Sequence, residues 1–396
     1  MSAIMNVYRR FPVAFVKGEG AWLIDDQGRR HLDFCSGIAV TALGHCHPAL
    51  VRALCDQAHR LWHTSNLYRI PEQERLAARL AQASGLERVF FTNSGVEAME
   101  CAIKTVRKHF ADRGSPRRVI ITMEGSFHGR SMATISASGQ EKLTKGFDPL
   151  LPGFRQVPPE DPAALEAAID EETAAVLLEP VMGEGGIRAL SDDYLKAVRD
   201  LCDRHGLLLV FDEIQCGMGR TGRLFAFEWA GVRPDVLALA KGIGGGFPLG
   251  ACLASEEAAS GMTPGAHGTT YGGNPLAMAV GHAVLDVMLA PGFLDEVRAK
   301  AAHLERALRR LVEEEGDLVL ELRGRGLMRG LKLAPALESR AFAEAAVDDG
   351  ILVAPAGDNV IRLLPPLTIS DDEIDEGLAR LKAALARARA VAPATS

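Results

Sequence analysis

The chain has 396 residues, of which 47% are hydrophobic and 24% charged, values typical of a folded globular protein. The net charge of −7 argues against general nucleic-acid binding, which needs a basic face. No run reaches the ~20 apolar residues of a membrane-spanning helix, residues 1–15 lack the apolar stretch of a signal peptide, and the seven cysteines include no CxxC pair. We therefore expect a cytoplasmic protein without membrane or nucleic-acid partners.

The predicted elements begin with two short strands within residues 21–34, around a turn at 25–28. From residue 72 onward, helical and strand patterns alternate. The predicted helices are residues 72–83, 94–110 and 192–205, and the predicted strands are 88–92, 119–123, 174–181, 207–213 and 236–240. Apolar strands that alternate with helices predict an α/β fold with a mainly parallel sheet covered on both faces.

The pattern changes after Asp286. One long amphipathic stretch runs to Glu315 and is followed by strand-like segments at 318–322 and 328–333. A helix, a strand at 360–364 and a final helix complete the chain. This order predicts a smaller α+β domain.

The ends of the predicted strands should carry the chemistry, because ligands of open α/β sheets bind outside the carboxyl ends of the strands. After the strand at 88–92, Ser94 and Gly95 begin a helix and are suited to bind an anion. The alternative is a plain helix cap, with Ser94 and Glu97 forming a capping box. After the strand at 119–123, Phe127, His128 and Arg130 are suited to stack on and grip a planar anionic ligand, and a surface loop is the alternative.

Two further strand ends carry isolated charges. Asp212 and Glu213 follow five apolar residues, and a buried carboxylate needs a cationic or hydrogen-bonding partner. Lys241 is the one charge between Asp235 and Glu256. Burial would lower its pKa and leave a free amine, the nucleophile of imine chemistry. The alternatives are a helix-capping or ion-paired Asp212 and a solvated or carboxylate-paired Lys241.

The four strand ends together provide what pyridoxal phosphate (PLP) requires. The cofactor needs a lysine for the imine, an acid that keeps its ring nitrogen protonated, a phosphate site and a surface for its ring. Lys241, Asp212, Ser94 with Gly95, and Phe127 supply these four functions.

Two other kinds of site compete with this interpretation. Residues 217–222 match GxGxxG, the nicotinamide-binding motif, but residues 212–216 separate them from the apolar run 207–211 and no helical pattern follows. A metal hydrolase could use residues 45–47 with His59 and His63, but no HExxH or CxxC supports it, and we expect no metal. A third alternative is a binding protein without catalytic activity. It does not explain why the isolated Lys241 should face a strand end that carries the carboxylate of Asp212.

Five motifs resemble those of the class III aminotransferases, which are fold-type I PLP enzymes, and the resemblance covers nearly the whole chain. The motifs are Ser94-Gly95-x-Glu97-Ala98, Phe127-His128-Gly129-Arg130, Glu179-Pro180-x-x-Gly183-Glu184-Gly185-Gly186, Asp212-Glu213-x-Gln215 and Ala240-Lys241-Gly242. The resemblance implies that residues 1–50 form an N-terminal segment of the small domain, residues 51–285 the large PLP-binding domain, and residues 286–396 the C-terminal small domain.

Three further runs, residues 37–48, 147–154 and 362–367, resemble members that act on N-acetylornithine. The resemblance then implies 2-oxoglutarate as the amino acceptor. Ornithine, 4-aminobutyrate and succinyl-diaminopimelate stay open as alternative donors. Met182 stands where the family usually has glutamine before Gly183, which leaves the fine specificity open.

The resemblance also implies roles at the cofactor. Lys241 would form the imine and move a proton between the substrate carbon and the cofactor C4′. Asp212 would pair with the pyridinium nitrogen, and Gln215 would bond the ring 3-oxygen. The other cofactor contacts would be made by Phe127, against the ring face, and by Ser94, Gly95 and Val96, at the phosphate.

The remaining implied roles concern the substrate and a second subunit. Arg130 and Thr269 would hold the substrate, Arg362 would clamp a carboxylate bidentately, and Glu184 would be the gate residue that pairs with an arginine. The loop at 268–275 would reach the neighbouring subunit, with Thr270 as its phosphate ligand. A homodimer with shared active sites is therefore expected.

Overall fold

The computed structural model describes residues 3–391, so residues 1–2 and 392–396 of the predicted first and last domains lie outside it. Its largest element is a seven-stranded sheet, in which β12 alone runs antiparallel to its neighbours. In spatial order the strands are β4 (Arg88–Thr92), β12 (Gly250–Ala254), β11 (Val236–Leu239), β10 (Leu208–Asp212), β7 (Thr173–Leu178), β5 (Val119–Met123) and β6 (Phe154–Val157). The predicted α/β class with a mainly parallel sheet is confirmed.

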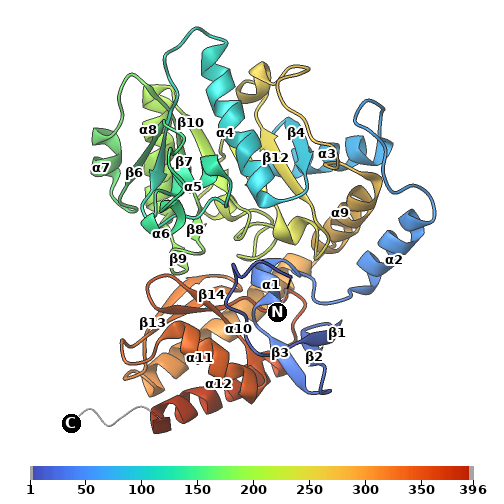
Figure 1. Ribbon diagram of the computed structural model, residues 1–396, viewed down its shortest axis with the longest axis vertical. Helices are drawn as coiled ribbons and strands as arrows, with labels where there is room; N and C mark the ends of the chain where they lie inside the picture. Colours follow the sequence, from blue (N-terminus) through green and yellow to red (C-terminus); the bar gives the residue numbers. More distant parts are fainter. Residues whose placement is uncertain (1–2, 392–396) are drawn as a thin grey trace.

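Both faces of this sheet are buried, as its continuous apolar strands predicted. In β10, Leu209 and Phe211 pack into one apolar cluster, whereas Leu208 and Val210 pack into another on the opposite face. Figure 1 shows helices on both sides of the strands. The helices of this part are α2 (Pro48–Ala58), α3 (Pro71–Ser84), α4 (Gly95–Ala111), α5 (Met132–Ser138), α6 (Glu141–Thr144), α7 (Pro162–Ala167), α8 (Asp192–His205) and α9 (Pro275–Met288).

The remaining strands form smaller sheets below the large one in Figure 1. One antiparallel sheet has the order β13 (Val319–Arg325), β14 (Met328–Leu333), β17 (Val360–Leu363) and β16 (Ala354–Ala356). Another has the order β1 (Phe15–Glu19), β2 (Trp22–Asp25), β3 (Arg30–Asp33) and β15 (Ile351–Leu352). The short remaining elements are α1 (Ser36–Ala39), α11 (Ser339–Ala346), β8 (Val181–Met182) and β9 (Arg188–Ala189), and α12 is Asp371–Val391.

The pairing of β3 with β15 is parallel and joins the N-terminal strands to the C-terminal part of the chain. Figure 1 shows the blue N-terminal strands beside the orange and red C-terminal elements. This is the arrangement that the predicted division into residues 1–50, 51–285 and 286–396 assumes. The boundaries themselves stay a prediction.

Several elements of the structure, among them β1, α2 and β6, have no counterpart among the predicted elements, and one predicted helix is divided. The single stretch expected at 286–315 is divided between the end of α9 and α10 (Phe293–Glu314), which meet at 71°. Pro291 and Gly292 lie at the bend between the two helices. Gly292 immediately precedes α10 and has a left-handed φ of 86°, a conformation that glycine adopts readily and that interrupts a helix. β12 was not predicted at all.

Among the described residues no single helix is long and apolar enough to cross a membrane, and α9 with α10 passes that test only as a bent pair.

Candidate active site

A cavity of about 620 Å³ lies at the carboxyl ends of β4, β5, β10 and β11. It brings together eight of the residues predicted from the sequence. These are Ser94, Gly95, Val96, Phe127, Arg130, Asp212, Gln215 and Lys241. His128 also lines it, as do Tyr8 and Glu179, to which no role was assigned. The strand ends therefore converge on one site, as the rule for open α/β sheets requires.

Asp212 lies at the end of β10 and is only 4% exposed. One carboxylate oxygen, Oδ2, is 2.9 Å from Nδ1 of His128, and the other accepts a bond of 3.1 Å from the backbone N–H of Ile214. Because a carboxylate only accepts, this contact favours the proton on Nδ1 of His128. The ring's buried Nε2 has no partner among the described residues. The sequence motif around His128 predicts that this residue helps to grip a planar ligand, but it does not predict the contact with Asp212.

Glu179 is a second residue whose role was missed. It follows β7, is 4% exposed, and accepts backbone bonds from Phe127 at 2.9 Å and Gly183 at 3.0 Å. Burial raises the pKa of its carboxyl, while His128 opposes this shift. Glu179 thus fixes the loop that carries the Phe127 ring. A glutamate directly after the apolar run 174–178 was the available sequence signal.

The start of α4 is both a capped helix end and a place suited to bind an anion, the two alternatives considered for Ser94 and Gly95. Ser94 caps the helix, since its Oγ accepts a 3.4 Å bond from the N–H of Glu97. The Glu97 carboxylate reaches Asn93 instead of Ser94, at 2.6 Å from the backbone N and 2.9 Å from Nδ2. A Cβ on Gly95 would lie 2.9 Å from Ile214, so glycine permits this close approach. The unpaired N–H groups and positive dipole of the first turn make it suited to bind an anion.

Lys241 follows β11 with a left-handed φ of 52°. Burial is the main cause that lowers its pKa, and Arg362 adds to the effect, while Glu184, Asp212 and Glu179 oppose it. Within residues 3–391 no carboxylate lies within ion-pair distance of its Nζ. The alternative of a carboxylate-paired lysine is therefore not what the structure shows, and the amine is available as a nucleophile.

Arg362 lies on β17, in one of the smaller sheets, and is 2% exposed. Its guanidinium forms an ion pair with Glu184, donates a 2.8 Å bond to the Pro355 carbonyl, and lies 3.4 Å from Oε1 of Gln215. The arginine partner expected for Glu184 is thus present. Gln215 connects this pair to the cavity wall.

Four predicted residues are not part of the cavity lining in a single chain, namely Glu184 and Arg362, described above, and Thr269 and Thr270. Thr269 accepts a 3.1 Å bond from the backbone N–H of Gly272, and its Oγ1 is 3.5 Å from Nδ2 of Asn93. Thr270 is exposed. Arg130, which does line the cavity, is exposed, and its guanidinium carbon is 5.8 Å from the ring centre of Phe127.

The competing sites do not assemble in the structure. Residues 217–222 form turns instead of opening a helix, and the buried Arg220 bonds backbone carbonyls. His45 pairs with Asp33 at 2.7 Å, and His47 caps α2. Across the described part of the chain, no group of His, Cys, Asp or Glu could hold a metal ion.

Comparison with known proteins identifies the family. The model of the aminotransferase class-III family matches residues 4–385. The chain belongs to the class III aminotransferases. It is 57% identical to an acetylornithine aminotransferase of Mesorhizobium japonicum, covering 99% of each chain, and 56% identical to that of Agrobacterium fabrum, covering 97% and 96%.

Solved structures agree with this membership and with fold type I. An N-acetylornithine aminotransferase from Stenotrophomonas maltophilia aligns with a TM-score of 0.85 and 43% identity, covering 97% of this chain and 98% of that one. An ornithine aminotransferase from Toxoplasma gondii, whose active site holds PLP at partial occupancy, aligns with a TM-score of 0.93 and 33% identity, covering 98% and 93%. The cofactor of this class III aminotransferase is PLP, as predicted.

The residues of the cavity fit this cofactor. The aldehyde of PLP needs an unpaired amine, which Lys241 provides, and its ring nitrogen needs a buried acid, which Asp212 provides. The first turn of α4 offers N–H groups to a phosphate, and Gly95 leaves no Cβ in the way. Phe127 adds an aromatic surface within the same cavity.

Proposed function

We propose that the protein transfers the terminal amine of N2-acetyl-L-ornithine to 2-oxoglutarate, yielding N-acetylglutamate semialdehyde and glutamate, a step of arginine biosynthesis. The observation that carries the reaction class is the unpaired amine of the partly buried Lys241, which lies in one cavity with Asp212. The choice of donor is supported by the similarity of the whole chain to acetylornithine aminotransferases, such as the one that is 57% identical.

The residues at the cofactor have separate tasks. When bound, PLP supplies the electron sink that stabilises negative charge on the substrate carbon. Lys241 would bind the aldehyde carbon and, once released, move a proton between the substrate carbon and C4′. Asp212 would hold a proton on the ring nitrogen, and its contact with His128 keeps the carboxylate oriented. Gln215 would bond the ring 3-oxygen, and Phe127 would lie against the ring.

The phosphate and the substrate carboxylates use other residues. Ser94, Gly95 and Val96 would bind the phosphate through the first turn of α4. Arg362 would bind a carboxylate of the acceptor, and a carboxylate that does so has to displace Glu184 from its ion pair. Arg130 and Thr269 would hold the rest of the substrate.

We also propose that the enzyme is a cytoplasmic homodimer that shares its active sites. Asn66 donates hydrogen bonds of 3.2 and 3.1 Å to the backbone carbonyls of Thr269 and Gly272, in the loop that carries Thr270. These bonds hold segment 61–68 against segment 268–275. Large apolar side chains are exposed on these two segments, namely Leu61, Trp62, Leu67, Tyr68 and Tyr271. Such a patch beside Thr270 favours a second copy of the chain. All seven cysteines are free thiols, which supports a reducing compartment.

Two measurements test this function. Lys241→Ala is expected to lose both the absorbance band of the covalently held cofactor and transamination, and a variant that keeps both contradicts the reaction class. For the donor, we expect kcat/KM to be higher for acetylornithine than for ornithine, 4-aminobutyrate or succinyl-diaminopimelate. Ornithine is the main alternative donor, because the chain has the same fold as the ornithine aminotransferase of Toxoplasma gondii. A higher kcat/KM for ornithine would contradict acetylornithine as the donor and would leave the reaction class unchanged.

A further inference from the structure

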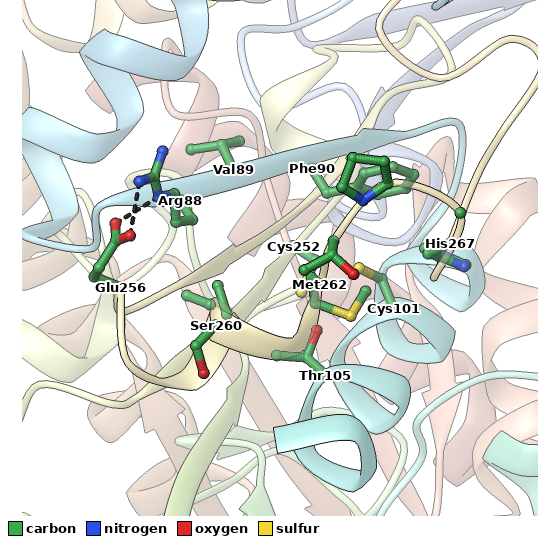
Figure 2. A pocket seen from close by; sticks show the side chains of 15 residues that line it. Arg88, Val89, Phe90, Cys101, Thr105, Cys252, Glu256, Ser260, Met262 and His267 are labelled. Atoms are coloured by element: carbon green, nitrogen blue, oxygen red, sulfur yellow. Dashed lines mark hydrogen bonds and ion pairs between the residues drawn. The ribbon is translucent and has the colours of Figure 1, made fainter. Parts of the chain in front are cut away.

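A second cavity, of about 600 Å³, lies between β4, β12 and α4 (Figure 2). It shares no lining residue with the active-site cavity. The ion pair of Arg88 with Glu256, at 2.5 Å, lies at one end, and His267 lies at the other. Cys101 and Cys252 are both part of the lining.

The two cysteines come from different elements that pack against each other. Cys101 is on α4 and Cys252 is on β12, and they belong to the same apolar cluster. Figure 2 shows their side chains next to each other, beside Met262 and Thr105. Both are nearly buried, at 2% and 3% exposure, yet both border the cavity, so a small solute that enters it meets the two sulfurs.

The polar neighbours favour ionisation of one thiol of the pair. A hydrogen bond from Cys252 lowers the pKa of Cys101, and His267 and the Thr105 hydroxyl add to this effect. The same hydrogen bond between the two thiols, together with burial, raises the pKa of Cys252. Nζ of Lys104 lies 2.9 Å from Nδ1 of His267 and adds positive charge at this end of the cavity. Cys101 is thus the better nucleophile, and Cys252 is placed to react next.

The other cysteines lack this environment. Burial raises the pKa of Cys35, Cys202 and Cys216, which makes these thiols poor nucleophiles. Cys46 and Cys55 are exposed and line neither this cavity nor the active-site cavity. The combination of two adjacent thiols, a cationic neighbour and an open cavity is found at Cys101 and Cys252.

We propose that Cys101 and Cys252 form a peroxide-reactive site, at which hydrogen peroxide oxidises them to an intrachain disulfide. The Cys101 thiolate attacks one peroxide oxygen, the O–O bond breaks, and a sulfenic acid and hydroxide form. The Cys252 sulfur then attacks the sulfenic sulfur, the S–O bond breaks, and water leaves as the S–S bond forms. Two electrons pass from the two sulfurs to the peroxide, whose oxygens end as two water molecules once the hydroxide takes up a proton.

The test uses the holoenzyme and hydrogen peroxide. After treatment, quenching and unfolding, the number of titratable thiols is expected to fall by two per chain, with a peptide pair that joins residues 101 and 252. A dithiol reductant should restore both thiols. Cys202→Ser, which removes a buried thiol outside the cavity, is the matched control and should form the same bond.

The variants separate the two steps. Cys101→Ser should abolish the disulfide, whereas Cys252→Ser should stop at a sulfenic acid on Cys101 that a dimedone probe labels. Because the labelling is a positive signal, it decides the matter even if Cys101→Ser fails to fold. The proposal is overturned if peroxide leaves the two thiols free in the wild-type enzyme, if the bond joins other cysteines, or if no label appears at Cys101 in Cys252→Ser.

Discussion

The close approach of Gly95 to Ile214 allows a quantitative test of the phosphate site. In Gly95→Ala the new Cβ would lie 2.9 Å from both Cδ1 and Cγ2 of Ile214 and 3.3 Å from Cγ1. Carbon atoms in contact prefer about 3.5–4.0 Å, so the side chain or the first turn of α4 must move. Overpacking of this kind costs about 1–3 kcal/mol.

The cost should appear in cofactor affinity. The free protein can relieve the contact by shifting the first turn of α4, whereas a bound phosphate needs that turn in place. At 1.4 kcal/mol per factor of ten, the Kd for PLP should rise about 5- to 150-fold. The measurement is a titration of the cofactor-free protein with PLP, followed by absorbance.

A second substitution makes this prediction specific. Ile214→Ala removes the three atoms that the new Cβ would meet. In that background, Gly95→Ala should change the Kd by less than about twofold, because no steric conflict remains. The reasoning is refuted if Gly95→Ala binds PLP as tightly as the wild type, or if it loses the same affinity with and without Ile214.

Two other predictions concern a buried acid and the shared site. Burial raises the pKa of Glu213 from 4.5 to about 8. Between these pH values the folded state therefore binds one proton more than the unfolded state does. The free energy of unfolding should fall as the pH rises from 4.5 to 8, by up to about 1.4 kcal/mol per pH unit. Denaturant midpoints from pH 5 to 8 should show a shallower fall for Glu213→Gln, and equal slopes would exclude the shift. Mixed dimers of Lys241→Ala and Thr270→Val chains should regain activity that neither variant has alone, since one site would then have both residues; no recovery would place Thr270 in its own chain's site.

The parts of the fold that followed from the sequence are those with strong local patterns. The bounds of β4 and β5 agree with the predicted strands, because each is an apolar run between clear breaks. The site followed for the same reason. Asp212 is the last residue of one buried strand and Lys241 follows the end of another closely. Topology places such residues at one edge of the sheet.

The missed features depend on packing between distant segments. β12 has the sequence GACLA, whose small residues give little strand preference, and it forms because β11 and β4 pair with it on both sides. The contact between His128 and Asp212 spans 84 positions, and no local pattern announces it. The break between α9 and α10 did have a local signal, since Pro291 and Gly292 form a typical helix stop.

The parallel pairing of β3 with β15 has a consequence for the order of folding during synthesis. The last strand of the large sheet ends at Ala254, whereas the pairing of Leu32 with Ile351 needs a segment that is translated almost a hundred residues later. The sheet that carries Lys241 can therefore form while the rest of the chain is still on the ribosome. The N-terminal strands must wait for β15, with the outer edge of β3 unpaired until then. A chain that ends before residue 351 would keep that edge open, and we expect it to associate through it.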